Sequence, residues 1–151
     1  MKFEFSAGGI VYKRETMRKN NSRNHAKTIL ILVAQHSQHH GWVFPKGLID
    51  AHKKETREEA ALREVEEETG VIGKILKPLS PVTYWYVWEK EKIKKTVYYF
   101  IMEYLSGDIA KHDMEMENVE WIPTDGVEER LTFKADKKVW QEAKRLMADG
   151  K

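Results

Sequence analysis

A glutamate-rich segment, residues 55–71 (ETREEAALREVEEETGV), constrains the fold more than any other part of the chain. Its start has the form of a capping box, with Thr56 as the N-cap and Glu59 three residues later. Gly70 stands where a glycine commonly follows the last turn of a helix. We therefore predict a helix between Thr56 and Gly70. Its predicted core-facing residues are Ala61, Leu62, Val65 and Thr69.

The opposite face of this helix carries three carboxylates, Glu64, Glu67 and Glu68. A helix turns by about 100° per residue, so positions i, i+3 and i+4 share one face. Like charges at this spacing repel each other, at a cost of about 0.2–0.5 kcal/mol per pair even when exposed. Because Mg²⁺ and Mn²⁺ prefer oxygen ligands, the cluster favours a divalent cation site. Taken alone, the three residues would also fit a solvated acidic face.

Length and composition restrict the class of protein. The 151 residues suffice for one domain, which we expect to span residues 1–151, and a hydrophobic share of 41% excludes a disordered chain. A net charge of +2 excludes the general positive field of a protein that coats nucleic acid. The absence of cysteine excludes disulfides, thiolate zinc sites and a cysteine nucleophile.

Two features of the sequence bear on location. The first residues, MKFEFSAGGIVY, lack the basic-then-apolar profile of a secretory signal. The longest apolar run, Ile29 to Ala34, is too short to cross a bilayer. We therefore expect a cytoplasmic protein that does not enter a membrane.

Runs of β-branched and aromatic residues, bounded by glycine, proline and charged segments, predict the strands. Strands are expected at residues 6–12, 28–35, 42–47, 71–76, 82–88, 94–104 and 118–122, and a terminal amphipathic helix at residues 133–147. Residues 13–27 and 89–95 are strongly charged, and we predict that they form the tips of two hairpins, the first of them long and mobile. Strands mixed with two helices predict an α/β sandwich.

The spacing within the glutamate-rich segment resembles the signature of the Nudix hydrolases, GX5EX7REUXEEXGU, in which U is aliphatic. Residues Glu55 to Val71 match its second part at every fixed position. Other similar segments are Ala7–Val11, Trp42–Gly47 and the region around Trp121. The chain departs from the pattern in one place, because seven residues, not five, separate Gly47 from Glu55, and Lys54 replaces the usual glycine. The resemblance implies a Nudix α/β/α sandwich with a mixed central sheet.

The resemblance also implies roles for the residues of the signature. The implied ligands of Mg²⁺, for which Mn²⁺ can substitute, are the carboxylates of Glu64, Glu67 and Glu68 and the main-chain carbonyl of Lys46. Glu64 is the first choice for the general base. Glu55 and Arg63 are implied to pair, and so to brace the loop against the helix.

A further metal ligand is expected from the loop before Trp121. In the dinucleoside polyphosphate and RNA pyrophosphohydrolase branches of the family, a glutamate precedes this tryptophan by six residues, a position that Glu115 takes here. Glu117 is the second choice. Either residue alone would also fit a solvated acidic loop.

Substrate contacts are expected from the aromatic strands. The FPKG segment and the run from Lys95 to Phe100 are similar to the diadenosine polyphosphate hydrolases and their diphosphoinositol relatives. The predicted contacts are Lys46 and Lys95, which would face the polyphosphate, and Tyr84, Tyr86 and Tyr99. Stacking on a base contributes about 1–3 kcal/mol where it occurs. Aromatic residues at alternate positions of a strand are otherwise typical of a core.

The resemblance implies hydrolysis of a phosphoanhydride in a nucleoside diphosphate-linked substrate. A dinucleoside polyphosphate, such as diadenosine tetra- or hexaphosphate, is the preferred substrate. Alternatives within the class are a nucleoside triphosphate, a diphosphoinositol polyphosphate and the 5′ end of an RNA, although RNA is not favoured. A Nudix-fold module that binds a nucleotide without cleaving it is the alternative from a different class. A monomer and a homodimer both fit the family.

For two polar segments the sequence leaves more than one function open. His36, His39 and His40 lack a strict ligand spacing, so a metal role is not favoured, whereas contact with a pyrophosphate is open. The basic residues 13–27 would suit RNA or an inositol polyphosphate, but a flexible hairpin tip is the favoured interpretation.

Overall fold

Eight strands form one sheet in the computed structural model, which describes residues 1–18 and 25–149. The strands are β1 (Lys2–Arg18), β2 (His25–His36), β3 (Trp42–Val43), β4 (Lys46–Leu48), β5 (Val71–Pro78), β6 (Val82–Trp88), β7 (Glu91–Gly107) and β8 (Met116–Pro123). The helices are α1 (Arg57–Thr69), α2 (Val127–Arg130) and α3 (Lys134–Asp149), and short 3₁₀ turns lie at Ala51–Lys53, Ile109–Lys111 and Thr124–Gly126. Among the described residues, no helix is long and apolar enough to cross a membrane.

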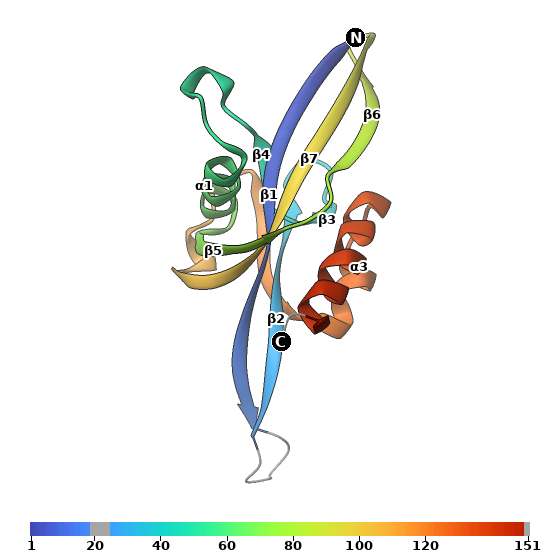
Figure 1. Ribbon diagram of the computed structural model, residues 1–151. Helices are drawn as coiled ribbons and strands as arrows, with labels where there is room; N and C mark the ends of the chain where they lie inside the picture. The colour runs from blue at the N-terminus through green and yellow to red at the C-terminus, as the bar shows by residue number, and fades with distance from the viewer. Residues whose placement is uncertain (19–24, 150–151) are drawn as a thin grey trace.

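The sheet is mixed because one central pair of strands is parallel. Its order is β3-β2-β1-β7-β5, while β4 pairs with β1, β6 with β7 and β8 with β2. The parallel pair is β1 and β7, in register from Lys2 opposite Ile93 to Tyr12 opposite Glu103. The other strand pairs are antiparallel. Figure 1 shows β1 and β7 side by side through the middle of the molecule.

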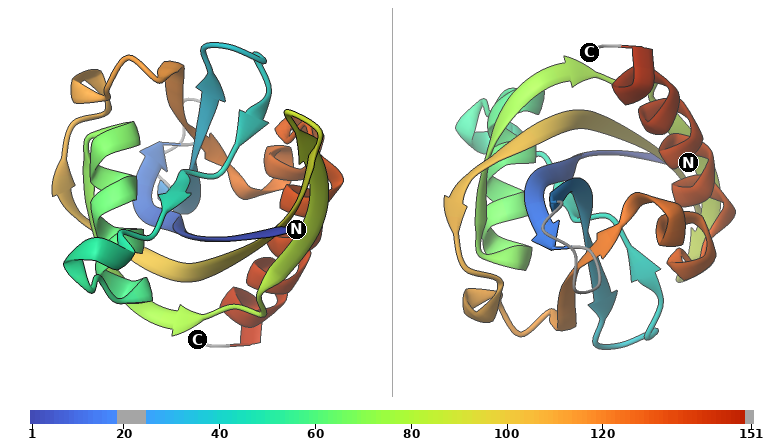
Figure 2. Two further views of the ribbon diagram at one scale, coloured as in Figure 1. Left: turned by 90° about the horizontal axis from the view of Figure 1, so that it is seen from above. Right: turned by 90° about the horizontal axis from the view of Figure 1, so that it is seen from below.

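Helices α1 and α3 cover opposite faces of the sheet, as the two end-on views in Figure 2 show. Successive strand residues point to opposite faces, so neighbours in sequence join different cores. Ile10, Ile31 and Ile101 belong to the core that includes Trp140 of α3. Val11, Leu32 and Met102 belong to the core that includes Val65 of α1. The predicted α/β/α sandwich with a mixed central sheet is confirmed.

The first hairpin differs from the prediction. Residues 13–18 and 25–27 were expected in a long tip, but they continue the antiparallel ladder, from Lys13 opposite Leu30 to Arg18 opposite His25. Backbone pairing of this kind needs no apolar side chains. The polar sequence of these residues therefore gave no sign of a strand. The rest of the predicted tip, residues 19–24, lies outside the described residues.

The second hairpin also has a shorter tip than predicted. Only Glu89 and Lys90 form the turn, because Trp88 already pairs with Glu91. Both turn residues have positive φ, +48° and +64°, as a two-residue type I′ turn requires. Ile93, in the middle of the charged run, is buried in β7. Because lysines surround Ile93, the sequence pattern predicted a hairpin tip here and not a strand.

The ends of α1 are as predicted. The Thr56 side chain accepts a hydrogen bond from the Glu59 amide (3.0 Å), and the Glu59 carboxylate accepts one from the Thr56 amide (2.9 Å). Gly70 ends the helix with φ +80°. The buried face differs in part, since it consists of Ala60, Ala61, Val65, Glu68 and Thr69, with Leu62 only half-buried. One of the three clustered carboxylates thus points into the protein.

Replacing Gly70 by alanine should destabilise the protein, because a Cβ there would lie 2.2 Å from the Asp108 carbonyl oxygen and the backbone is left-handed. We expect Gly70→Ala to lower the free energy of unfolding by about 2 kcal/mol or more, measured by urea denaturation. The matched control is Gly126→Ala, where a Cβ would meet nothing within 4 Å. A change within about 0.5 kcal/mol is expected there. Equal losses in the two variants would contradict this account.

Candidate active site

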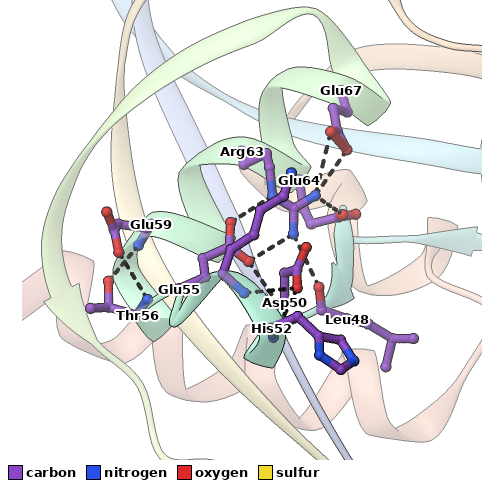
Figure 3. A network of polar contacts seen from close by, with 10 residues as sticks. Leu48, Asp50, His52, Glu55, Thr56, Glu59, Arg63, Glu64 and Glu67 are labelled. Carbon is purple, nitrogen blue, oxygen red and sulfur yellow. Dashed lines mark hydrogen bonds and ion pairs between the residues drawn. The ribbon is translucent and has the colours of Figure 1, made fainter.

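A single arginine organises the polar residues of α1 (Figure 3). Arg63 donates through Nε to Glu55 Oε2 (2.6 Å) and through Nη2 to Glu55 Oε1 (2.9 Å), a bidentate ion pair. Nη2 also donates to the Leu48 carbonyl (3.1 Å). The hydrogen bonds from Arg63 hold the pKa of Glu55 below its usual value. The loop that leads into α1 is therefore attached to the helix at both of its ends.

The two extra residues of this loop are accommodated in one turn. Asp50 caps the 3₁₀ turn Ala51–Lys53, because its side chain accepts hydrogen bonds from the amides of His52 (3.1 Å) and Lys53 (3.3 Å). Lys54, where the family pattern has glycine, ends the turn in the left-handed region with φ +53°. The Asp50 amide in turn donates to Glu55 (2.9 Å). Glu55 thus reaches Arg63 in spite of the longer loop.

The third guanidinium nitrogen of Arg63 binds two of the clustered carboxylates. Nη1 donates to Glu64 Oε1 (2.6 Å) and to Glu67 Oε2 (3.1 Å). Burial raises the pKa of Glu64 in spite of this bond, and the negative charges of Glu67 and Glu115 act in the same direction. Glu67 is half-exposed by contrast. In this arrangement the arginine supplies the positive charge nearest to the cluster.

Glu68 is the most buried of the clustered carboxylates, with 2% of its surface exposed. It accepts a hydrogen bond from the Lys46 amide (3.2 Å). Burial, with Glu115 and Glu64 nearby, raises the pKa of Glu68 to about 9. A carboxylate so placed is costly to ionise unless a cation arrives.

A pocket of about 470 Å³ brings together five of the predicted site residues. Those that line it are Lys46 of β4, Glu64 and Glu68 of α1, Lys95 of β7, and Glu115 from the loop before β8. Glu55, Arg63 and Glu67 do not line it and reach it only through the Arg63 contacts. Gly47 lies directly against Glu64, since a Cβ there would be 1.8 Å from Glu64 Oε2. Only glycine lets β4 approach the carboxylate this closely.

The donor set of this pocket fits a hard divalent cation. Glu64, Glu68 and Glu115 offer carboxylate oxygens, and their mutual repulsion adds to the raised pKa of Glu68. Among residues 1–18 and 25–149, however, no three His, Asp or Glu side chains are grouped so that they could hold a metal ion as they stand. Arg63 Nη1 keeps Glu64 and Glu67 engaged, so metal binding requires these carboxylates to turn from the guanidinium.

The two candidates for an additional ligand are separated by their histidine partners. Glu115 lines the pocket and lies 3.6 Å from His36 Nε2. Glu117 forms a close contact with His40 Nδ1 and does not line the pocket. This geometry favours Glu115, the first choice, over Glu117.

A second, largely apolar cavity of about 340 Å³ adjoins the acidic pocket. Its lining consists of His39, Val43, Lys46, Val82, Tyr84, Val97, Tyr99, Phe133, Ala135 and Asp136. Two of the three predicted tyrosine contacts, Tyr84 and Tyr99, therefore line this cavity together with the predicted contact Lys46, although Tyr99 is buried. The remaining tyrosine, Tyr86, lines neither hollow and donates instead to Glu4. His39, Val43 and Lys46 line both hollows.

Sequence reasoning missed Asp136, a buried carboxyl group in the wall of the apolar cavity. It is 5% exposed, and it accepts hydrogen bonds from Tyr99 Oη (3.4 Å) and from the Phe44 amide (3.5 Å). Burial raises its pKa. From sequence alone it is indistinguishable from any acidic residue in the first turn of a helix, where such residues are common.

His39, for which a metal role was not favoured and a pyrophosphate contact was left open, lines the apolar cavity as well. Its ring stacks on His36 with centroids 4.3 Å apart and meets Phe133 edge-on. Burial lowers its pKa, and the positive charge of Lys46 contributes. A neutral imidazole therefore lies where the acidic and apolar hollows join.

Comparison with known protein families assigns the chain to a family by its sequence. The model of the NUDIX domain matches residues 17–148, and the chain belongs to this family. A protein of Mycobacterium tuberculosis named MutT4 is 35% identical over 106 residues, which are 70% of this chain and 42% of that protein. The 8-oxo-(d)GTP phosphatase of Mycolicibacterium smegmatis is 30% identical over 133 residues, 88% of this chain and 39% of that protein. The chain thus spans about two fifths of the length of these two relatives.

Another relative matches over nearly its whole length. The asymmetrical bis(5′-nucleosyl)-tetraphosphatase of Rattus norvegicus is 28% identical over 143 residues, which are 94% of both chains. Among solved structures, an Ap4A hydrolase binary complex from C. elegans superposes with a TM-score of 0.74 at 21% identity. It covers 97% of this chain and 98% of that one, and at this identity the likeness shows the fold.

Replacing Glu68 by glutamine should stabilise the metal-free protein at high pH. The pKa of Glu68 is about 9 in the folded chain against an ordinary 4.5, so the folded state binds this proton more tightly. Stability is then lost as pH rises from about 4.5 towards 9. With EDTA present, we expect Glu68→Gln to gain about 1–3 kcal/mol at pH 8 and nearly nothing at pH 4.5, measured by urea denaturation.

The matched control for this prediction is Glu67→Gln, on the same helix but half-exposed. It should change the free energy of unfolding by less than about 0.5 kcal/mol at either pH. A pH-independent effect of Glu68→Gln would show that Glu68 ionises normally in the folded protein.

Proposed function

We propose that this chain is a divalent-metal-dependent pyrophosphohydrolase whose preferred substrate is a dinucleoside polyphosphate, such as diadenosine tetra- or hexaphosphate. The observation that supports it is the junction of an acidic pocket with an apolar cavity through His39 and Lys46. A substrate with a flat base at one end of a phosphate chain suits this pair of hollows. The family generally uses divalent metals, and Mg²⁺ is our choice for this member.

The carboxylates of α1 would hold the metal together with the main-chain carbonyl of Lys46. When bound, Mg²⁺ supplies positive charge to the phosphate oxygens and lowers the pKa of a coordinated water. Without a metal, Arg63 holds Glu64 and Glu67 through Nη1 and is itself fixed by Glu55, so both carboxylates would turn from the guanidinium to bind the metal. Glu64 remains our candidate for the general base, because burial raises its pKa towards the operating range of a base.

Lys46 and Lys95 would receive the phosphate chain. Both line the acidic pocket, and Lys46 also lines the apolar cavity. Burial lowers the pKa of Lys95, with the charge of Lys46 as the next cause. An entering polyphosphate would stabilise both ammonium groups, because charge-assisted hydrogen bonds to phosphate are strong.

The dinucleotide preference draws on the relative that matches at full length. The tetraphosphatase of Rattus norvegicus aligns over 94% of this chain and 94% of its own length. The base of one nucleoside would lie against Tyr84 in the apolar cavity. The rest of the phosphate chain would pass the acidic pocket.

An oxidised purine nucleoside triphosphate is a second candidate substrate, and Asp136 favours it. A carboxyl group in an apolar wall can accept hydrogen bonds from the N–H groups of a purine edge, and it discriminates strongly against bases that leave it unpaired. The phosphatase of Mycolicibacterium smegmatis, 30% identical, is named for such a substrate.

The activity is tested with a panel of diadenosine tetraphosphate, ATP, 8-oxo-dGTP, ADP-ribose, a diphosphoinositol polyphosphate and triphosphorylated RNA, in ¹⁸O-water with Mg²⁺. We expect the highest kcat/KM for the dinucleotide. Glu67→Gln should lower kcat by at least about 100-fold, because it removes a metal ligand. Glu66→Gln, an exposed neighbour on the same helix, should leave it unchanged. Absence of Mg²⁺-dependent hydrolysis across the panel would refute the enzyme and leave a binding module.

Truncating Tyr84 should weaken substrate binding selectively. Tyr84→Ala removes an aromatic wall of the apolar cavity, so KM for diadenosine tetraphosphate should rise about five- to 100-fold while kcat changes little. Tyr86→Ala is the matched control, since Tyr86 shares the strand but does not line the cavity. If both variants raised KM equally, the base would not lie in this cavity.

A further inference from the structure

One end of the sheet leaves a face with exposed aromatic side chains. There β1, β7 and β6 lie side by side, beyond α1, at the upper end of the molecule in Figure 1. Phe3 pairs with Lys94, which pairs in turn with Trp85. The next row across the same strands is Phe5, Thr96 and Thr83. Adjacent strands are about 4.8 Å apart, so the rings of β1 and β6 flank the lysine row of β7.

These residues share the face that α1 covers farther along the strands. Ala7 of β1 and Tyr98 of β7 pair with each other and belong to the core around α1. Alternate residues of a strand point to the same side, which places Phe3 and Phe5 with Ala7. At the end of the sheet the cover is incomplete, since Phe3 is 55%, Phe5 48% and Trp85 48% exposed.

The face is positively charged as well as aromatic. The ammonium groups of Lys92 and Lys94 lie 4.7 Å and 5.5 Å from the centre of the Trp85 ring. Residues 3, 5, 83, 85, 87, 92, 94 and 96, which share this face, include no carboxylate. The nearby acids of the strands, Glu4 and Glu91, occupy alternate positions, and Glu4 pairs with Tyr86 on the other face.

We propose that this strand-end platform (Phe3, Phe5, Trp85, Lys92 and Lys94) binds single-stranded nucleic acid. Bases stack on exposed aromatic rings of an open sheet face, and phosphates are neutralised by lysines set between the rings. A protein partner would have to bury both lysines and supply carboxylates for them, at a large desolvation cost. A nucleic acid strand supplies one phosphate for each base, and this spacing matches an alternation of rings and cations.

A hollow beside the platform indicates the direction in which a bound nucleic acid strand would run. It measures about 850 Å³ and is lined by Phe3, Phe5 and Tyr98 together with the loop before α1. Arg57 stacks on Tyr98, with its guanidinium carbon 3.8 Å from the ring centre. Leu48 lines both this hollow and the acidic pocket, so the two lie next to each other.

Three carboxylates also line the hollow: Glu4 of β1, and Glu55 and Glu58 on its helix side. Glu55 is neutralised by Arg63, and Glu4 accepts a hydrogen bond from Tyr86 on the other face of β1, which leaves Glu58 as the carboxylate that would repel a phosphate most. The nucleic acid strand would therefore run along the side of β1 and β6, over Lys92 and Lys94. This proposal does not depend on the enzymatic one, because binding is measured without metal or turnover.

The test measures binding by fluorescence anisotropy of labelled 12-nucleotide oligonucleotides, single-stranded and duplex. The titrations contain EDTA and cover a range of salt concentrations. We expect the single strand to bind more tightly than the duplex. Trp85→Ala and Phe3→Ala should each raise Kd at least about fivefold. The double variant Lys92→Gln, Lys94→Gln should reduce the salt slope by about 0.7 for each lysine that contacts a phosphate. Phe3, Trp85 and Lys92 are exposed and Lys94 is half-buried, so thermal unfolding should change little.

The matched control is Trp88→Ala, a tryptophan of the same strand that is 64% exposed but lies on the opposite face. It should change Kd by less than about twofold. Three results would overturn the proposal: no saturable binding up to about 100 μM protein, an equal loss in Trp88→Ala, or self-association in sedimentation that Trp85→Ala abolishes while oligonucleotide binding is absent. The last would assign the face to a contact between copies of this chain.

Discussion

The bidentate pair between Arg63 and Glu55 is the interaction on which the site depends. It joins the loop after β4 to the middle of α1, and Arg63 also holds the Leu48 carbonyl and two carboxylates of its own helix. Because a bidentate pair fixes both position and plane, one side chain sets the geometry of loop and helix together. The longer loop is tolerated for this reason, since its additional residues form a separate 3₁₀ turn that leaves Glu55 in reach.

The buried position of Glu68 follows from that geometry and opposes stability. Once α1 is fixed against β4, Glu68 is shielded from solvent and accepts a hydrogen bond from the Lys46 amide. Three carboxylates then share one pocket with two lysines, and the raised pKa of Glu68 expresses the unfavourable balance. A site that is costly without a cation is strongly biased to bind one, because binding removes the repulsion that folding creates.

The sequence predicted local structure well where short-range chemistry decides it. Thr56, Glu59 and Gly70 end α1 as expected, since capping requires only neighbours in the chain. The predicted ligands Glu64, Glu68 and Glu115 line one pocket, whereas their role in metal binding stays a prediction. The extent of β1, β2 and β7 was underestimated, because their charged ends pair through the backbone. Asp136 and the difference between Tyr84 and Tyr86 depend on packing across the sheet, which no local pattern encodes.

The two faces of β7 carry the two surfaces for which a function is proposed. Lys95 faces the acidic pocket, and Lys94, the next residue, stacks on Trp85 on the opposite side of the sheet. Because strand side chains alternate, a slip of one residue in the pairing of β1 with β7 would exchange them. That register continues for eleven pairs into the buried core, where Ile10 and Ile101 lie on one side and Val11 and Met102 on the other. The core therefore determines which lysine faces the acidic pocket and which lies on the outer face.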